Sequence, residues 1–399
     1  MKILILSQLY YIEGRQDLVH DTNAVHYLVK YWTSDNDVLV INTYINYRNK
    51  IFRYLNKEAR NYYFNDYSFE KDGVKVWLVE NQLLTKRFFQ RWNWKRLERK
   101  VNRILDEENF SPDIIVSHFP CYSYDYIGNI HSDAPRIGVL HESDTFHAEH
   151  DFEYLKGLET NFDACFCRSK RIYSYFRDKK LSNLREEIIY SGAPDSKEAI
   201  IDNSRFFSKK KWNIFYAGKF IERKHVDWII EAVSRFPDVN LEFNIAGEGE
   251  KEAHLKNIVS ELQLGERVHF LGKLSREETM ERMRNSDIFC MPSTGETFGL
   301  VYLEAMRAGC ITIGTKGEGI DGVLNNGVNG FLINGKEELI ELFRRIFNEY
   351  SVEMLDNISK EAICTAEEYS EKNMSKRYLE LIVSIWRKQK NDRKTKKDN

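Results

Sequence analysis

Short apolar runs alternate with amphipathic segments along most of the 399-residue chain. The amphipathic segments repeat their apolar positions with the 3.6-residue period of a helix, whereas the short runs are nearly continuous, as in strands buried on both faces of a parallel sheet. This alternation predicts an α/β architecture with parallel sheets. In the first half we expect strands at 3–7, 38–41, 114–117 and 136–140, and a helix at 22–32.

The same alternation continues through the second half of the chain. The expected strands lie at 212–217, 241–246, 268–271, 288–291 and 311–314. The expected helices lie at 251–262, 275–285, 300–308 and 336–349, with a last one at about 370–388. A polar stretch at about 195–211 separates the halves, so we predict two domains of similar size.

Composition excludes several classes of protein. The 59 basic and 61 acidic residues leave a net charge of −2, so no global field favours nucleic acid. A hydrophobic content of 42% excludes a disordered chain. The six cysteines have no disulfide-framework spacing, and we expect reduced, mostly buried thiols and no metal site. The first apolar run is too short for a signal peptide or a membrane span. We expect a cytoplasmic protein, at most peripheral to a membrane.

Glycine is concentrated in the second half of the chain. Residues 1–200 hold six of the 21 glycines, and the remaining residues hold 15. Glycine is needed where the backbone approaches a ligand closely or adopts a positive φ angle. The second half is therefore the half in which we expect phosphate-handling loops.

The most informative segment is STGETFGLVYLEAMRAG at 293–309. A predicted strand leads into a glycine-containing loop that opens a helix, and a helix N-terminus offers free N–H groups to phosphate. Glu296 precedes this helix, and Glu304 lies about two turns inside it. Carboxylates accept hydrogen bonds from sugar hydroxyls, so the spacing suits a nucleotide sugar. The alternative is that Glu296 caps the helix and Glu304 is solvated.

This segment resembles the E-x7-E motif of the retaining GT-B glycosyltransferases of family 4 (glycosyl transferases group 1). Three further segments resemble that family in the same order: the basic loop GKFIERKHVD at 218–227, the strand and turn FNIAGEGE at 243–250, and VHFLGKL at 268–274. The resemblance covers about residues 210–335. It implies two Rossmann-like domains that face each other across a cleft.

The resemblance also implies the domain limits and a role for the last helix. An N-terminal acceptor-side domain would span 1–195, and a nucleotide-sugar-binding domain would span 196–368. Residues 369–399 would form a helix that crosses back to the first domain and ends in a basic tail.

The resemblance implies a role for each residue of the donor site. Glu296 would bind the donor sugar, and Glu304 would bind the ribose hydroxyls. Thr297, Phe298, Gly299 and Leu300 would line the donor, the last three through backbone N–H groups. Lys219 and Lys224 would contact the diphosphate, so no metal is required. Arg223 is an extra cation beside Lys224 and a further candidate for donor binding. Lys273 and Leu274 lie in the segment that meets the base. The donor would be UDP- or GDP-linked, and no other cofactor is implied.

Three positions depart from the family pattern. Lys219 stands where the family usually has Arg, and Lys lacks the bidentate fork of the guanidinium group. His225 replaces a usual Gly, and Gly322 replaces a common acidic residue. The alternative for the three basic residues is a solvated surface loop. Residues 317–322 also fit G-x-G-x-x-G, but the chain breaks again at 325–330, so we reject a dinucleotide fingerprint.

The first half has fewer family signals. Gly14 is the one glycine after the first strand, and its backbone is a candidate contact for the donor phosphate. His118 and His141 each follow a predicted strand. His141 opens an HESD sequence that resembles the family's acceptor region, where it would position the acceptor hydroxyl. The alternative for both is a structural histidine.

Residues 86–104 predict a basic aromatic helix. Eight Lys or Arg residues are interleaved with Phe88, Phe89, Trp92 and Trp94, against the single acid Glu98. Such a helix is suited to an anionic membrane surface. The alternative is an ordinary surface helix whose aromatic residues pack inward.

Taken with the resemblance, the sequence predicts a metal-independent retaining hexosyltransferase. It would move a sugar from a nucleotide diphosphate to a hydroxyl of a saccharide or lipid-linked acceptor, in synthesis of a cell-surface polysaccharide. The leaving diphosphate would assist deprotonation of the acceptor on the same face of the sugar. The alternatives are a nucleotide-sugar epimerase on the same scaffold and a non-catalytic partner subunit.

Overall fold

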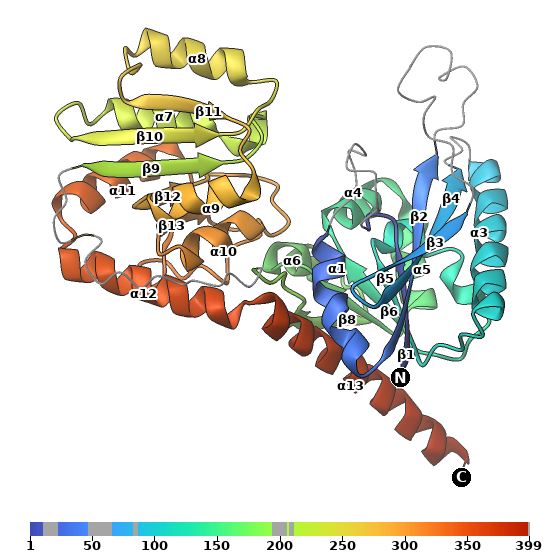
Figure 1. Ribbon diagram of the computed structural model, residues 1–399. Helices are drawn as coiled ribbons and strands as arrows, with labels where there is room; N and C mark the ends of the chain where they lie inside the picture. Colours follow the sequence, from blue (N-terminus) through green and yellow to red (C-terminus); the bar gives the residue numbers. More distant parts are fainter. Residues whose placement is uncertain (11–22, 47–65, 83–86, 194–205, 207–210, 398–399) are drawn as a thin grey trace. The chain divides into compact units, whose positions relative to one another are not determined.

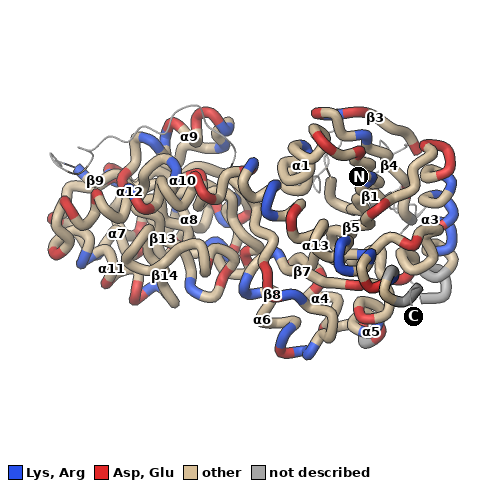
Figure 2. The backbone as a smooth tube through the Cα atoms, turned by 90° about the horizontal axis from the view of Figure 1, so that it is seen from below, with Lys and Arg blue, Asp and Glu red and all other residues tan. Residues whose placement is uncertain are grey.

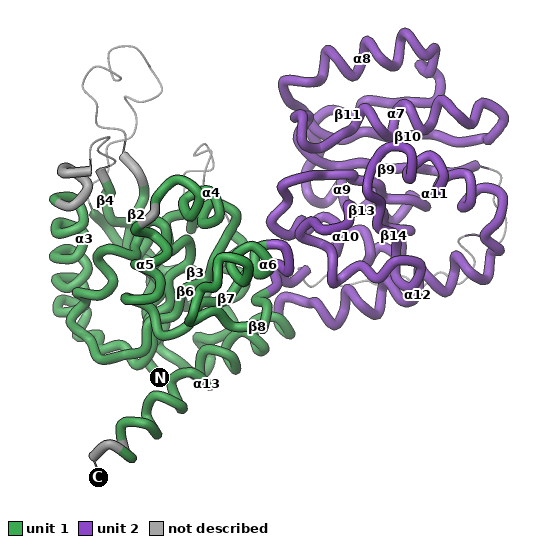
Figure 3. The backbone as a smooth tube through the Cα atoms, turned by 180° about the vertical axis from the view of Figure 1, so that it is seen from behind, with its two compact units in different colours: residues 1–168, 172–189, 372–399 green, residues 169–171, 190–371 purple. Residues whose placement is uncertain are grey.

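The computed structural model describes residues 1–10, 23–46, 66–82, 87–193, 206 and 211–397. These residues form two units, shown in Figure 3. Unit 1 comprises residues 1–168, 172–189 and 372–399, and unit 2 comprises residues 169–171 and 190–371. Each unit buries its own apolar core. The predicted linker at 195–211 lies almost wholly outside the described residues.

An eight-stranded sheet forms the centre of unit 1, in the order β3-β4-β2-β1-β5-β6-β7-β8 (Figure 1). Its strands are β1 (Lys2–Ser7), β2 (Asp37–Asn46), β3 (Tyr67–Lys71), β4 (Val74–Gln82), β5 (Ile114–His118), β6 (Arg136–Leu140), β7 (Ala164–Cys167) and β8 (Leu184–Ile188). Strands β5 and β7 are buried at every residue, which agrees with the continuous apolar runs in the sequence.

The β3–β4 pair corrects the prediction of purely parallel sheets, because these two strands run antiparallel. Asp72 and Gly73 connect them with φ angles of 49° and 74°. Two left-handed residues are what a tight two-residue hairpin loop requires, and Asp-Gly is a favoured pair for it. The other neighbouring strands of this sheet are parallel.

The helices of unit 1 complete its layers. They are α1 (Ala24–Val29), α3 (Arg87–Glu107), α4 (Glu142–His150), α5 (Phe152–Asn161), α6 (Lys170–Asp178) and α13 (Glu371–Lys397), with 3-10 turns η1 (Lys30–Ser34), η3 (Pro120–Tyr122) and η4 (Ile127–Asn129). The single helix expected at 22–32 is thus a short α-helix that tightens into a 3-10 turn. Aromatic and β-branched residues at 31–33 are weak helix formers, which favours the early end.

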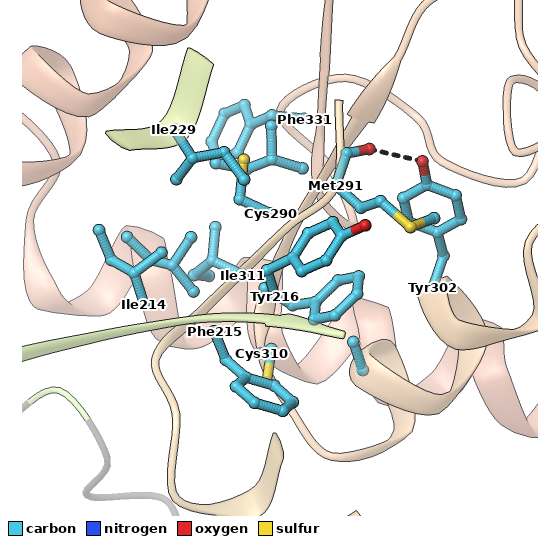
Figure 4. Close-up of a cluster of buried hydrophobic side chains, with 14 of the residues drawn as sticks. Ile214, Phe215, Tyr216, Ile229, Cys290, Met291, Tyr302, Cys310, Ile311 and Phe331 are labelled. Carbon is cyan, nitrogen blue, oxygen red and sulfur yellow. Dashed lines mark hydrogen bonds between the residues drawn. The ribbon is translucent and has the colours of Figure 1, made fainter. Parts of the chain in front are cut away.

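Unit 2 contains a six-stranded, fully parallel sheet in the order β11-β10-β9-β12-β13-β14. Its strands are β9 (Trp212–Ala217), β10 (Leu241–Ala246), β11 (Val268–Gly272), β12 (Ile288–Cys290), β13 (Ile311–Thr315) and β14 (Phe331–Ile333). Its helices are α7 (Val226–Ser234), α8 (Glu252–Glu261), α9 (Arg276–Arg284), α10 (Leu300–Arg307), α11 (Lys336–Asn348) and α12 (Val352–Glu368), with the 3-10 turn η5 (Glu222–Lys224). Figure 4 shows part of the core that they bury.

Helix α13 packs against unit 1 through its first turns. The indole Nε1 of Trp32 donates to the carbonyl of Ser375 at 3.0 Å, and the Ser375 hydroxyl donates to the carbonyl of Leu28. Tyr378 packs edge-on against Trp32 at 4.9 Å between ring centroids. These contacts attach the end of the chain to unit 1.

Apart from the three residues 169–171, the chain passes between the units at 189–190 and again at 371–372. Just inside unit 2 the two passages are hydrogen-bonded: Ala193 N donates to the carbonyl of Tyr369 at 2.8 Å, and Glu371 N donates to that of Ala193 at 2.9 Å. A Cβ on Gly192 would lie 2.4 Å from the Cα of Glu371. Glycine is therefore required where the two passages touch.

Among the parallel strands of each sheet, strand order reverses once. In unit 1 the reversal lies between β1 and β5, and in unit 2 it lies between β9 and β12. Ligands of open parallel sheets bind beyond the carboxyl ends of the strands at this switch point. The loops that follow β9 and β12 hold the predicted basic residues and Glu296, and His118 ends β5.

Two predictions from composition concern the thiols and the membrane. All six cysteines are free, and five of them are buried, as expected. In the part of the chain that the structure describes, no helix has the length and apolarity that a bilayer crossing demands.

Candidate functional site

Two loops meet at the switch point of unit 2, one after β9 and one after β12. Thr294 N donates to the carbonyl of Arg223 at 2.8 Å, and the Arg223 Nη1 donates back to the carbonyl of Thr294 at 3.3 Å. The ring Nε2 of His225 lies 3.1 Å from the Thr294 hydroxyl. The basic loop and the glutamate loop therefore form one hydrogen-bonded surface.

Lys224 and Glu296 form an ion pair at the centre of this surface. Their side chains are only 11% and 16% exposed, and Arg223 Nη1 lies 3.4 Å from the same Glu296 oxygen. Burial alone would raise the pKa of Glu296, but the two cations outweigh it and hold that pKa below its usual range. Burial lowers the pKa of Lys224, and Glu296 partly offsets this. Glu296 is therefore an ionised carboxylate beside two cations, and not a helix cap.

The start of α10 offers unpaired backbone N–H groups beside this ion pair. Among the described residues, the N–H groups of Thr297, Phe298, Gly299 and Leu300 have no protein acceptor. Free N–H groups at a helix N-terminus attract anions. The four predicted donor-lining residues thus form a cradle suited to phosphate.

Gly299 is needed for this cradle on two grounds. Its φ angle is 80°, and a Cβ there would lie 2.6 Å from the ring of Tyr302. Tyr302 is buried, and its hydroxyl donates to the carbonyl of Met291 at 2.6 Å (Figure 4). This bond fixes the first turn of α10 against the end of β12, so the N–H groups have a defined direction.

Glu304 lies at the fifth position of α10, closer to its start than the two turns we predicted. Its side chain is 16% exposed, and Arg276 Nη2 of α9 lies 2.9 Å from its Oε1. Burial raises the pKa of Glu304, and Arg276 offsets only part of this. Glu304 is therefore not a solvated surface carboxylate but a half-buried acceptor with one cationic partner.

Close backbone contacts hold the basic loop in position. A Cβ on Gly247 would lie 1.9 Å from the carbonyl oxygen of Gly218, which only glycine avoids. The Tyr216 hydroxyl donates to the carbonyl of Lys219 at 2.9 Å. The Lys219 side chain itself is exposed and has no ion-pair partner in the described parts of the chain. Its ammonium is free to take an anion.

Segment 268–274, which the resemblance places at the nucleotide base, contributes Lys273 and Leu274 in different ways. Lys273 is exposed and pairs with Glu248 at 3.5 Å across the loops after β11 and β10. Leu274 is partly buried and packs against the core of unit 2. The structure thus gives Leu274 a packing role, and leaves Lys273 at the rim of the loops.

His141 lies in unit 1, at the carboxyl end of β6, and caps α4. Its backbone N–H donates to the Asp144 carboxylate at 2.7 Å, and Asp144 also accepts from Cys121 N at 2.9 Å. Its ring lies 3.1 Å from that of His118, which ends the neighbouring strand β5. The two histidines that the sequence places at strand ends are therefore direct neighbours. Gly14 lies outside the described residues.

Because of these two histidines, we expect the stability of unit 1 to fall at acidic pH. Burial lowers the pKa of both rings well below the ordinary value of 6.5. The unfolded chain therefore binds more protons below pH 6.5, so stability falls as the pH drops from 7.5 to 5.5, by up to about 1.4 kcal/mol per pH unit for each ring. Urea unfolding at several pH values measures this slope. The His118→Gln/His141→Gln variant should have a smaller slope, and an unchanged slope would contradict the assignment.

A metal site was not predicted, and the described residues contain no group of three or more His, Cys, Asp or Glu side chains arranged for one. The chain has one Asp-x-Asp sequence among the described residues, at 35–37; it ends in the first residue of β2 and so lies at the amino edge of the sheet. That edge is opposite to the strand ends at which His118 and His141 lie.

Helix α3 contains residues 87–104 of the basic aromatic segment, whose first residue lies outside the described residues, and basic positions recur along the helix in Figure 2. Several of these cations are paired: Arg96 with Glu80 at 2.9 Å, and Lys100 with Asp66 at 2.7 Å. Trp94 packs edge-on against Tyr124, whereas Trp92 is 53% exposed. These contacts favour an ordinary surface helix for the described part of α3.

Comparison with known protein families finds a similarity within unit 2. Residues 197–364 match the model described as "Glycosyl transferases group 1". The chain is similar to this family over that segment, which lies within unit 2. A glycosyltransferase of Methanocaldococcus jannaschii, MJ1178, is 28% identical over 218 residues, which cover 52% of this chain and 58% of that protein. The lipopolysaccharide core biosynthesis glycosyltransferase LpsE of Rhizobium meliloti is 33% identical over 117 residues, 29% of this chain and 33% of LpsE.

The chain thus aligns with less than two thirds of the length of either relative. A solved structure matches far more of it: Anabaena Alr3699/HepE in complex with UDP, with a TM-score of 0.67 and 18% identity over 96% of this chain and 100% of that one. With its two Rossmann-like units, the chain has the GT-B fold. The expected fold class is confirmed.

The backbone conformation at His225 is one that glycine adopts more easily than other residues. His225 has φ 47° and ψ 43°, a left-handed conformation that costs a non-glycine residue roughly 1–2 kcal/mol. The ring compensates by stacking on Trp228 at 4.1 Å and by its bond to Thr294. Gly322, the position of the common acidic residue, has φ 100°, so the loop backbone here also favours glycine.

This strain gives a stability prediction for His225. His225→Ala loses the stacking and the hydrogen bond but keeps the strain, whereas His225→Gly removes the strain. The Gly variant should therefore be about 1–2 kcal/mol more stable than the Ala variant. Urea unfolding measures the difference, and an Ala variant at least as stable as the Gly variant would contradict it.

Sequence reasoning missed two residues of the candidate site. Arg276 binds Glu304, and the Glu318 carboxylate accepts from Glu296 N at 3.0 Å. Neither pairing has a sequence signal, because each joins separate elements that only the packed sheet brings together. The Ser293 hydroxyl, 3.3 Å from Glu296, lies within the predicted motif.

Proposed function

We propose that the protein is a retaining glycosyltransferase of family 4 that transfers a hexose from a UDP-linked donor, without a divalent metal, to a hydroxyl of a saccharide or lipid-linked acceptor. The observation that carries this proposal is the buried Lys224–Glu296 pair beside the free N–H groups of α10. A cation, a carboxylate and a helix N-terminus side by side suit a diphosphate joined to a sugar.

The diphosphate would lie between the basic loop and the start of α10. Lys224, Arg223 and the free ammonium of Lys219 would surround it, and the N–H groups of residues 298–300 would donate to it. Glu296 would then exchange part of its ion pair for hydroxyls of the donor sugar. Glu304, five residues into α10, would accept from the ribose hydroxyls. These roles would account for both carboxylates and all three cations.

In the proposed reaction the acceptor oxygen bonds to the anomeric carbon while the bond from that carbon to the diphosphate oxygen breaks. The electron pair leaves with the diphosphate, and the acceptor proton passes to a diphosphate oxygen on the same face. Lys224 and the N–H groups of α10 stabilise the charge that develops there. Positively charged side chains can fill the role that a metal would have.

The proposed setting is the synthesis of a cell-surface polysaccharide on the cytoplasmic side. The name of LpsE, with its role in lipopolysaccharide core biosynthesis, supports a saccharide or lipid-linked acceptor. The UDP in the HepE structure supports a uridine donor. The paired cations of α3 give no support to a membrane-binding face, and we leave that interaction out of the proposal.

A transfer assay tests this proposal. The protein would be incubated in EDTA with a panel of UDP- and GDP-sugars and oligosaccharide or lipid-linked acceptors, and the product analysed by proton NMR. The expected result is a new glycosidic bond with the anomeric configuration of the donor. An inverted product would overturn the retaining mechanism. A modified donor sugar formed without acceptor would indicate the epimerase, and loss of activity in EDTA would overturn metal independence.

A further inference from the structure

Three side chains of unit 1 form a buried hydrogen-bonded row that ends at His141. Tyr378 Oη lies 2.9 Å from His118 Nε2, and His118 Nδ1 lies 3.1 Å from His141 Nε2. Tyr378 comes from α13, His118 ends β5, and His141 follows β6. All three are buried, with exposures of 1%, 1% and 8%. The row therefore joins the C-terminal helix to the predicted acceptor-side histidine.

Packing holds these rings in one arrangement. Phe119 stacks on the His141 ring with centroids 3.7 Å apart, and it adopts a left-handed φ angle of 58° to do so. Such a conformation is strained for a bulky residue, and strain of this kind persists where the surroundings require a side chain in one place. On the other side, Tyr378 packs edge-on against His118 at 5.8 Å.

The hydrogen bonds couple the proton positions of the two rings. Each neutral imidazole has one N–H donor and one bare nitrogen. If the Tyr378 hydroxyl donates to His118 Nε2, His118 donates from Nδ1 and His141 has its proton on Nδ1. In the opposite arrangement, His141 Nε2 donates to His118 Nδ1, and His118 Nε2 donates to the Tyr378 oxygen. Either way, the tautomer of His141 depends on the hydroxyl of Tyr378.

Charged groups around the row keep it neutral. Arg168 follows β7, and burial together with this guanidinium lowers the pKa of both histidines. Asp144 of α4 is occupied by Tyr154 Oη at 2.6 Å and by two backbone N–H groups, including that of His141 itself. No described carboxylate is therefore bonded to either ring, and both rings act as neutral hydrogen-bonding groups.

We propose that Tyr378 and His118 are positioning residues that fix the tautomer and orientation of His141, so that one defined ring nitrogen faces the substrate. The proposal rests on the proposed function, in which His141 contacts the acceptor. A hydrogen bond at one ring nitrogen sets which form the other nitrogen takes. The C-terminal helix thus acts on the reaction through this row, without touching substrate.

The test compares Tyr378→Phe with Ser375→Ala. Both substitutions remove one buried hydroxyl of α13, but Ser375 bonds to the carbonyl of Leu28, away from the row. Tyr378→Phe should lower kcat about ten- to a hundredfold, with the KM of the donor nearly unchanged, because a misplaced group costs about that much. It should also shift the acidic limb of the pH profile of kcat. Ser375→Ala should retain the kcat and pH profile of the unsubstituted protein.

Two further measurements separate the possible failures. Nitrogen-15 NMR of the histidine side chains should show a changed tautomer of His141 in Tyr378→Phe and no change in Ser375→Ala. An unchanged kcat, pH profile and tautomer in Tyr378→Phe would overturn the positioning role while leaving the proposed function intact. A fully active His141→Ala variant would instead overturn the assumed role of His141 in that function. Assays are run at a temperature at which thermal unfolding shows each variant folded.

Discussion

Lys224→Met is expected to lower kcat at least about a hundredfold, because it removes a cation that stabilises the departing diphosphate. It is also expected to cost about 2 kcal/mol of stability, since the buried Glu296 carboxylate keeps the more exposed Arg223 but loses its closer, more buried cationic partner. Activity assays with saturating donor measure the first effect, and urea unfolding measures the second.

The double variant Lys224→Met/Glu296→Gln separates these two effects. Replacing both partners of a buried ion pair by neutral groups is often close to neutral for stability. The double variant should regain most of the lost stability and remain inactive. Lys256→Ala is the matched control, because Lys256 forms an exposed ion pair with Glu252 on α8. Recovery of activity together with stability would show that Lys224 has only a structural role.

Glu304→Gln is expected to raise the KM of the donor about a hundredfold, with a much smaller change in kcat. The proposed contact is to the ribose, which is remote from the bond that breaks and is bound equally in the ground state and the transition state. A buried charged hydrogen bond is worth about 1.5–3 kcal/mol, which corresponds to this range. Steady-state kinetics with varied donor give both constants.

A pH series sharpens this second prediction. Burial raises the pKa of Glu304, so this carboxylate becomes protonated at a higher pH than an ordinary glutamate. As the pH is lowered, donor binding should therefore begin to weaken at that higher pH. This dependence should be absent in Glu304→Gln. Glu341→Gln, at an exposed pair with Arg344 on α11, is the control. A Glu304→Gln variant with unchanged KM and a large loss of kcat would place Glu304 at the reacting centre instead.

The fold was predictable because the signals for it are local. Short apolar runs and helical periodicity predicted five of the six strands of unit 2 nearly to the residue, and only the three-residue edge strand β14 was missed. The β3–β4 hairpin was missed although Asp72-Gly73 encodes it, because the flanking strands were not recognised as apolar runs. Strand β3 alternates half-buried and exposed residues, as an edge strand does.

The site was predictable only where one segment contains it. Glu296, Gly299 and the free N–H groups lie within one strand–loop–helix unit, so their spacing fixes their geometry. Lys224 meets Glu296 because the loops after β9 and β12 flank the same switch point, which the family resemblance implied and composition did not. The hydrogen bond between His118 and Tyr378 joins residues 260 positions apart, and no local sequence pattern predicts it.

Thermal stability of the purified protein against UDP-, GDP-, ADP- and dTDP-linked sugars in EDTA tests the central claim most directly. A ligand at about 100 times its Kd adds about 2.7 kcal/mol to the folded state, which gives a clear rise in Tm. The account predicts a rise that is selective for UDP-linked sugars and is absent in the stable Lys224→Met/Glu296→Gln variant. No rise with any donor, or an equal rise in that variant, would contradict a nucleotide-sugar site at the switch point of unit 2.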